Sequence, residues 1–142
     1  YAFKSLVEPA PGDGSIIMVV ATDAPLSDRN LERLASRAIM GLARTGSFAS
    51  NGSGDYAIAF STAESVRRKM PRQMGQAPAS YVDLSNDDMS GLFAAAVEAT
   101  EEAVYNSIFM ATMVESRSGK SEAIPLDKVA AALRKYGITR SP

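Results

Sequence analysis

The stretch Ser15–Thr22, which reads SIIMVVAT, decides the fold because it is apolar on both of its faces after the opening serine. Apolar runs of this length are typical of strands in sheets that other layers cover on both sides. The preceding residues 8–14 read EPAPGDG and indicate a loop that ends in glycine. The sequence therefore predicts a buried strand that opens with a hydroxyl directly after Gly14.

The pattern after this strand predicts a helix and a second strand. Ser27 is the expected N-cap of a helix over residues 28–43. The apolar residues of that helix fall on one stripe, formed by Leu31, Leu34, Ala35, Ala38, Ile39 and Leu42. Residues 45–54 are rich in Gly, Ser and Asn and indicate a loop. Residues 55–61 then predict a strand with Tyr56, Ile58 and Phe60 on one face.

The rest of the chain predicts two more helices and a long connection. Residues 63–86 have little periodicity and contain prolines and a glycine, so we expect a connection that could cover a site or a subunit contact. Helices are expected over residues 87–111 and 125–136, with Gly137 as the final stop. The first of these would run about 37 Å, longer than a small domain. A strand that is apolar on both faces needs neighbouring strands and a covering layer on each side, and two strands with three helices are too few to supply them. We therefore expect these elements to be part of a larger α/β (α+β) sheet.

The composition excludes several kinds of catalytic site. The 142 residues include no histidine and no cysteine, which excludes a Ser-His-Asp triad, a cysteine nucleophile, a disulfide and a Cys/His zinc site within the chain. A lysine, a carboxylate, a hydroxyl network or an α-amine remains as a base for a serine nucleophile. Cleavage of the Gly14–Ser15 bond would create such an amine beside the Ser15 hydroxyl.

Charge and hydropathy give no sign of nucleic-acid or membrane binding. The chain has 15 Lys+Arg against 16 Asp+Glu, so it has no strong positive field. Residues 67–69 form a short basic run that we expect in a solvated loop. No apolar stretch reaches the roughly 18 residues of a membrane-spanning helix. The choice between cytoplasm and periplasm stays open.

A second polar cluster, at residues 51–55 with the sequence NGSGD, precedes the second strand. In extended backbone Ser53 and Asp55 point to one face, where the pair could orient or relay a proton for another nucleophile. These residue types also form ordinary turns, so a purely structural turn is the commoner explanation. A backbone anion-binding nest is a third reading. A phosphate-binding loop over residues 45–54 is disfavoured because no Walker-type lysine follows it.

Six stretches resemble the β subunit of the DmpA-type aminopeptidases, the family of L-aminopeptidase/D-esterases and β-peptidyl aminopeptidases. The resemblance is carried by Gly12–Ile17, Ala21–Leu26, Arg44–Gly46, Asn51–Asp55, Ala59–Thr62 and Glu101–Asn106. Their order and spacing match the family from residue 12 to residue 106.

The resemblance implies a precursor that cleaves itself before a catalytic serine into a larger α and a smaller β subunit, which stay together. Ser15 matches the nucleophile, Ser53 the second serine of the site, and Asp55 the acidic residue two positions later, which is glutamate in some members. Residues 1–14 would be the carboxyl-terminal tail of the α subunit, and residues 15–142 the catalytic β subunit. The implied fold is an αββα sandwich, completed by the α subunit and distinct in topology from ordinary N-terminal-nucleophile hydrolases. Oxyanion-hole donors and groups that bind the substrate amine would come from the α subunit.

We therefore expect a self-processing serine aminopeptidase with no cofactor and no metal. Ser15 would attack the Gly14 carbonyl during maturation, and later the carbonyl of a short peptide, amide or ester, to give an acyl-enzyme that passes to water or to an amine. Its own amine, or Ser53 oriented by Asp55, would take the proton. The expected partners are the upstream α subunit, a small peptide or amino-acid amide, and further αβ units in a homo-oligomer. A non-catalytic assembly module with a structural serine loop is the alternative from another class.

Overall fold

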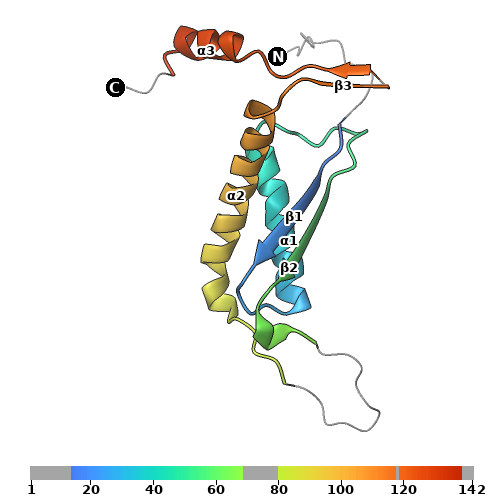
Figure 1. Cartoon of the computed structure of the whole chain (residues 1–142). Coiled ribbons are helices and arrows are strands. Elements are labelled where there is room, and N and C mark those ends of the chain that lie inside the picture. Colours follow the sequence, from blue (N-terminus) through green and yellow to red (C-terminus); the bar gives the residue numbers. More distant parts are fainter. Residues whose placement is uncertain (1–13, 69–79, 118, 139–142) are drawn as a thin grey trace. The chain divides into compact units, whose positions relative to one another are not determined.

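The computed structural model describes residues 14–68, 80–117 and 119–138 (Figure 1). Within them the helices are α1 (Asp28–Arg44), α2 (Met89–Phe109) and α3 (Leu126–Lys135), and the strands are β1 (Ile17–Thr22), β2 (Tyr56–Ser61), β3 (Val114–Ser116) and β4 (Gly119–Ser121). Short 3-10 helices lie at Glu64–Val66 and Asn86–Asp88. The expected mixed α/β class and the order of the main elements are confirmed. The expected α-subunit tail up to residue 13, Lys69 of the basic run and the middle of the long connection lie outside the described residues.

The chain divides into two compact units, Tyr1–Glu101 and Glu102–Pro142. In the first unit, β1 and β2 pair in parallel, with Ile17 opposite Tyr56 and Thr22 opposite Ser61. Parallel strands need a crossover connection, and α1 supplies it. α1 packs against both strands and lies behind them in Figure 1. The resulting β-α-β unit brings the amino ends of both strands to one edge.

One face of this small sheet is exposed. Five apolar side chains on it are between 46% and 71% exposed: Ile17, Val19, Tyr56, Ile58 and Phe60. The prediction that β1 is covered on both faces is therefore not met within the described part of the chain, where its exposed and less exposed residues alternate. The shared face of the three β2 residues is confirmed. β1 also begins at Ile17 instead of Ser15, because its pairing with β2 starts with Ile17 opposite Tyr56.

The opposite face of the sheet meets α1 and the first half of α2. The core cluster consists of Leu26, Leu34, Met89 and Ala96. The helices approach closely at Gly41, where a Cβ would lie 2.5 Å from the Val97 carbonyl oxygen. An ion pair of 2.9 Å from Arg44 to Glu101 joins them near the end of α1. α1 follows its predicted bounds, with Leu34, Ala35, Ala38 and Leu42 of the stripe buried, whereas Ile39 is exposed.

Polar contacts anchor the end of the long connection to the start of α1. The Asp83 carboxylate accepts hydrogen bonds from the Ser27 hydroxyl at 2.6 Å and the Ser27 backbone N–H at 2.8 Å. It also accepts from the side chain of Asn30, which is 1% exposed. These bonds, those from Ser27 first, lower the pKa of Asp83. Ser27 also accepts from the Asn30 N–H, which confirms it as the N-cap.

The second unit contains a hairpin that the sequence pattern did not predict. β3 and β4 pair antiparallel over three residues each, and all the residues described there are exposed. α2, which enters this unit, has 21 residues and a length of about 31 Å, shorter than predicted. α3 begins after Pro125 and ends before Gly137, whose φ of 70° suits the predicted stop. No helix in the described ranges is long and apolar enough to cross a membrane.

Candidate active site

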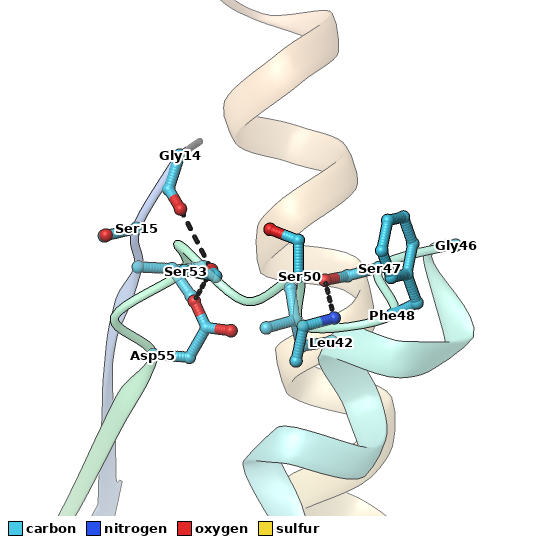
Figure 2. A pocket seen from close by; sticks show the side chains of 11 residues that line it. Gly14, Ser15, Leu42, Gly46, Ser47, Phe48, Ser50, Ser53 and Asp55 are labelled. Atoms are coloured by element: carbon cyan, nitrogen blue, oxygen red, sulfur yellow. Dashed lines mark hydrogen bonds between the residues drawn. The ribbon is translucent and has the colours of Figure 1, made fainter. Parts of the chain in front are cut away.

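The predicted nucleophile lies at the edge where both parallel strands begin. Ser15 is exposed and lies two residues before β1 (Figure 2). Its Oγ accepts a hydrogen bond of 3.0 Å from the Gly54 backbone N–H. The Tyr56 N–H donates to the Ile16 carbonyl at 2.9 Å and aligns the two segments. Since parallel strands start at the same edge, a residue before β1 must lie beside the residues before β2.

Ser53 connects the other predicted site residues to the bond before Ser15. Its Oγ lies 2.9 Å from the Gly14 carbonyl oxygen and 2.7 Å from Asp55 Oδ1. Both of these atoms accept, and a serine hydroxyl has a single hydrogen to donate. The hydroxyl can therefore donate its hydrogen bond to the carbonyl oxygen or to the carboxylate, one at a time. The structure thus brings Ser15, Ser53 and Asp55 together around the Gly14–Ser15 bond.

Only one oxygen of the Asp55 carboxylate has a hydrogen-bond partner among the described residues. Oδ1 accepts from Ser53, whereas Oδ2 is buried and has no hydrogen-bond partner among the residues that the structure describes. Buried carboxylate oxygens usually have a donor. Among the described residues, no group of three or more acidic, histidine or cysteine side chains could hold a metal ion.

Sequence reasoning missed the role of Gly54. A Cβ at this position would lie 3.3 Å from Ser15 Oγ, a tight contact, so the loop passes close to the predicted nucleophile. The spacing of NGSGD predicts that Ser53 and Asp55 share one face, but the glycine between them has no side chain from which a function could be predicted. Its N–H is nevertheless the group that fixes the Ser15 hydroxyl.

The loop after α1 forms the far wall of a hollow beside these residues. The hollow has a volume of about 350 Å³ and is lined by Gly14, Ser15 and Ser53 on one side and by Leu42 and Phe48 on the other (Figure 2). The sequence indicated only a loop here. Phe48 carried no periodic signal that could have identified it.

Comparisons with known proteins identify relatives of this chain. The family model of peptidase family S58 matches residues 2–122. The β-peptidyl aminopeptidase BapA of Sphingosinicella microcystinivorans is 42% identical over 128 residues, which are 89% of this chain and 31% of that protein. The chain thus spans about a third of the length of the relatives it matches.

Two solved structures are similar in fold. A protein of Pyrococcus horikoshii OT3 matches with a TM-score of 0.73 and 44% identity, over 89% of this chain and 35% of its own. The L-aminopeptidase D-Ala-esterase/amidase of Ochrobactrum anthropi matches with a TM-score of 0.71 and 38% identity, over 87% and 34%. It is described as a prototype for the serine aminopeptidases and a new variant of the Ntn hydrolase fold. The chain therefore belongs to peptidase family S58, and the family resemblance and fold class inferred from its sequence are confirmed.

Proposed function

We propose that this chain carries the nucleophile of a self-processing serine aminopeptidase. The observation that supports this most directly is the hydrogen-bonded group of Ser15, Ser53 and Asp55 around the Gly14–Ser15 bond. No histidine is present to act as a base. A nucleophile that creates its own amine by cleavage fits this arrangement.

Maturation begins with the carbonyl that Ser53 contacts. Ser15 Oγ attacks the Gly14 carbonyl carbon, and negative charge develops on the oxygen that lies 2.9 Å from the Ser53 hydroxyl. The carbon–nitrogen bond then breaks, the hydroxyl proton passes to the Ser15 nitrogen, and an ester remains. Water hydrolyses the ester to a Gly14 carboxylate and frees both the amine and the hydroxyl of Ser15. The Gly54 N–H holds Ser15 Oγ in position at the start.

Turnover uses the same hydroxyl. The new Ser15 amine, or Ser53 oriented by Asp55, takes the proton as Ser15 attacks the carbonyl after the first residue of a short peptide, amide or ester. The bond from the carbonyl carbon to the departing amine or alcohol breaks, the leaving group takes the proton, and water hydrolyses the acyl-enzyme to the free first residue and Ser15. Both the relative named as a β-peptidyl aminopeptidase and the one named as an L-aminopeptidase D-Ala-esterase/amidase support this substrate class. Transfer of the acyl group to an amine is a variant of the same step.

An upstream α subunit is the proposed partner. The exposed face of β1 and β2 carries five apolar side chains, which supports an additional layer over it. The relatives are about three times as long as this chain, which supports a further subunit to form that layer. In this proposal, residues 1–14 are the tail of the α subunit and residues 15–142 are the β subunit. The α subunit also supplies oxyanion-hole donors and the groups that bind the substrate amine, and the αβ units assemble into a homo-oligomer.

Intact mass of the full-length protein and its Ser15→Ala variant tests the proposal. The unaltered protein is expected to separate at Gly14–Ser15 and to hydrolyse amino-acid amides, whereas the variant stays whole and inactive. Ser36→Ala is the matched control, since its hydroxyl bonds to Glu32 within α1, away from the site. Cleavage at this bond in Ser15→Ala would contradict the proposal. An intact, unreactive bond in the unaltered protein would favour a non-catalytic assembly module instead.

A further inference from the structure

The hollow beside the Gly14–Ser15 bond has features that the mechanism above does not use. Its volume of about 350 Å³ lies near the lower end of the range for ligand sites, roughly 300 to 1,000 Å³. Leu42 and Phe48 contribute apolar surface opposite Ser53, as Figure 2 shows. The space suits one side chain better than a long segment of peptide.

The two glycines of the site differ in the room around them. A Cβ on Gly54 would lie 3.3 Å from Ser15 Oγ, whereas a Cβ on Gly14 would meet no described atom within 4 Å outside its two chain neighbours. The same hydroxyl attacks Gly14 in maturation and the substrate in turnover. The first residue of a substrate therefore takes the position of Gly14 and has room there for a side chain.

We propose that Phe48 is a specificity-determining residue, whose ring packs against an apolar side chain on the amino-terminal residue of the substrate. This inference rests on the proposed aminopeptidase function and specifies its substrate class. The Phe48 side chain is 86% exposed, so contact with an apolar side chain would remove a large apolar surface from water.

The charges around the hollow favour apolar over acidic side chains. Asp55 is one of the lining residues, and no lysine or arginine among the described residues lines the hollow. An acidic substrate side chain would lie near a like charge, and no lysine or arginine of the lining would balance it. An apolar side chain meets Leu42, which is 8% exposed, and the Phe48 ring.

Two local hydrogen bonds stabilise the turn that contains Phe48, one to a side chain and one within the backbone. Ala49 has a φ of 49°, in the left-handed region that residues with a Cβ rarely adopt. Its N–H donates to Ser47 Oγ at 3.4 Å, and the Ser53 N–H donates to the Ser50 carbonyl at 2.9 Å. The second bond links this turn directly to the serine that contacts Gly14.

The test compares kcat/KM for the amides of glycine, leucine and aspartate in the full-length protein. We expect leucine amide to be preferred and aspartate amide to be the poorest substrate. Phe48→Ala is expected to lower the leucine-to-glycine ratio by about tenfold, the usual effect of lost apolar contact in a side-chain pocket. Met40→Ala is the matched control, because Met40 is exposed on α1 and lies outside the lining of the hollow.

A gain of specificity provides a second test that a folding defect could not mimic. Phe48→Lys adds a cation beside the hollow and is expected to raise the aspartate-to-glycine ratio by about tenfold. An unchanged leucine-to-glycine ratio in Phe48→Ala, or no gain in Phe48→Lys, would overturn the inference. Equal use of leucine and aspartate amides by the unaltered protein would also overturn it.

Intact mass of each sample distinguishes this inference from the function on which it rests. If the protein is cleaved at Gly14–Ser15 and is active, but lacks the expected substrate preferences, only the proposed role of Phe48 is contradicted. Absence of both cleavage and amide hydrolysis in the unaltered protein contradicts the proposed function, and this inference with it.

Discussion

Replacement of Gly54 by alanine tests how closely the loop before β2 controls the nucleophile. The new Cβ would lie 3.3 Å from Ser15 Oγ and 3.6 Å from Tyr56 Cε2. The first distance is tighter than most contacts that a Cβ makes in proteins, so the neighbouring atoms must give way by a few tenths of an ångström. Either Ser15 Oγ moves or the loop does. Both movements lengthen the 3.0 Å hydrogen bond from the Gly54 N–H.

The size of the effect follows from this displacement. A shift of about 1 Å at a reacting atom costs about 100-fold in rate. A shift of a few tenths of an ångström therefore predicts a loss of about tenfold, which is about 1.4 kcal/mol of activation free energy. Stability should not fall, because Gly54 lies outside the left-handed region where alanine is strained. At such positions Gly→Ala commonly stabilises by about 0.4 to 1 kcal/mol through the unfolded chain.

Three measurements on the full-length protein check this prediction. They are the time course of Gly14–Ser15 cleavage by intact mass, the kcat of the processed protein on an amino-acid amide, and the urea midpoint of unfolding. Gly91→Ala is the control, because a Cβ at this exposed position of α2 meets nothing within 4 Å and should leave both rates unchanged. If Gly54→Ala cleaves itself and turns over at the unaltered rates, Gly54 does not fix the position of Ser15.

Three further substitutions test other parts of the structure. Ser53→Ala removes the donor to the scissile carbonyl and should slow cleavage, followed by intact mass, by about 100-fold to 1,000-fold; a normal rate would remove Ser53 from the mechanism. Gly41→Ala should lower the free energy of unfolding in urea by about 1 to 3 kcal/mol, because its Cβ would lie 2.5 Å from the Val97 carbonyl oxygen; an unchanged midpoint would contradict this helix contact. Asp83→Asn should cost up to about 1 kcal/mol at pH 7, since the carboxylate is exposed. The pKa of Asp83 is lowered in the fold, so its stabilisation is present above the unfolded pKa of 3.8 and is lost as the pH falls through the folded pKa. The difference between the two proteins in urea should therefore shrink as the solution becomes acidic; a difference that is constant with pH would contradict the bonds from Ser27.

The elements with long, clear periodicity could be predicted from the sequence. α1 has an apolar stripe and a serine N-cap, and the structure has it within one residue of the predicted bounds. The β3–β4 hairpin could not be predicted, because strands of three exposed residues carry no alternating pattern. The hydrogen bonds between Asp83 and Ser27 could not be predicted from the sequence either, because they join single polar residues 56 positions apart.

The candidate site was only partly predictable for a similar reason. Ser53 and Asp55 lie two positions apart, and that spacing alone predicts side chains on one face of an extended segment. The surroundings of a glycine have no such local signal. Gly14 and Gly54 are the same residue type, yet a Cβ on Gly14 would meet nothing within 4 Å outside its chain neighbours, whereas a Cβ on Gly54 would lie 3.3 Å from Ser15 Oγ. Their different roles depend on the pairing of β1 with β2, which joins residues about 40 positions apart.

The position of the candidate site at the amino ends of the strands follows from its proposed chemistry. Open α/β sheets usually bind ligands outside the carboxyl ends of their strands. A serine that uses its own α-amine must become the first residue of a chain, so it belongs at the start of a strand. Parallel pairing through α1 then brings the start of β2 to the same edge, with Ser53 beside the Gly14 carbonyl. In the proposed mechanism of a chain without histidine, the Ser15 amine or Ser53 thus takes the proton-handling role that an imidazole has in a Ser-His-Asp triad.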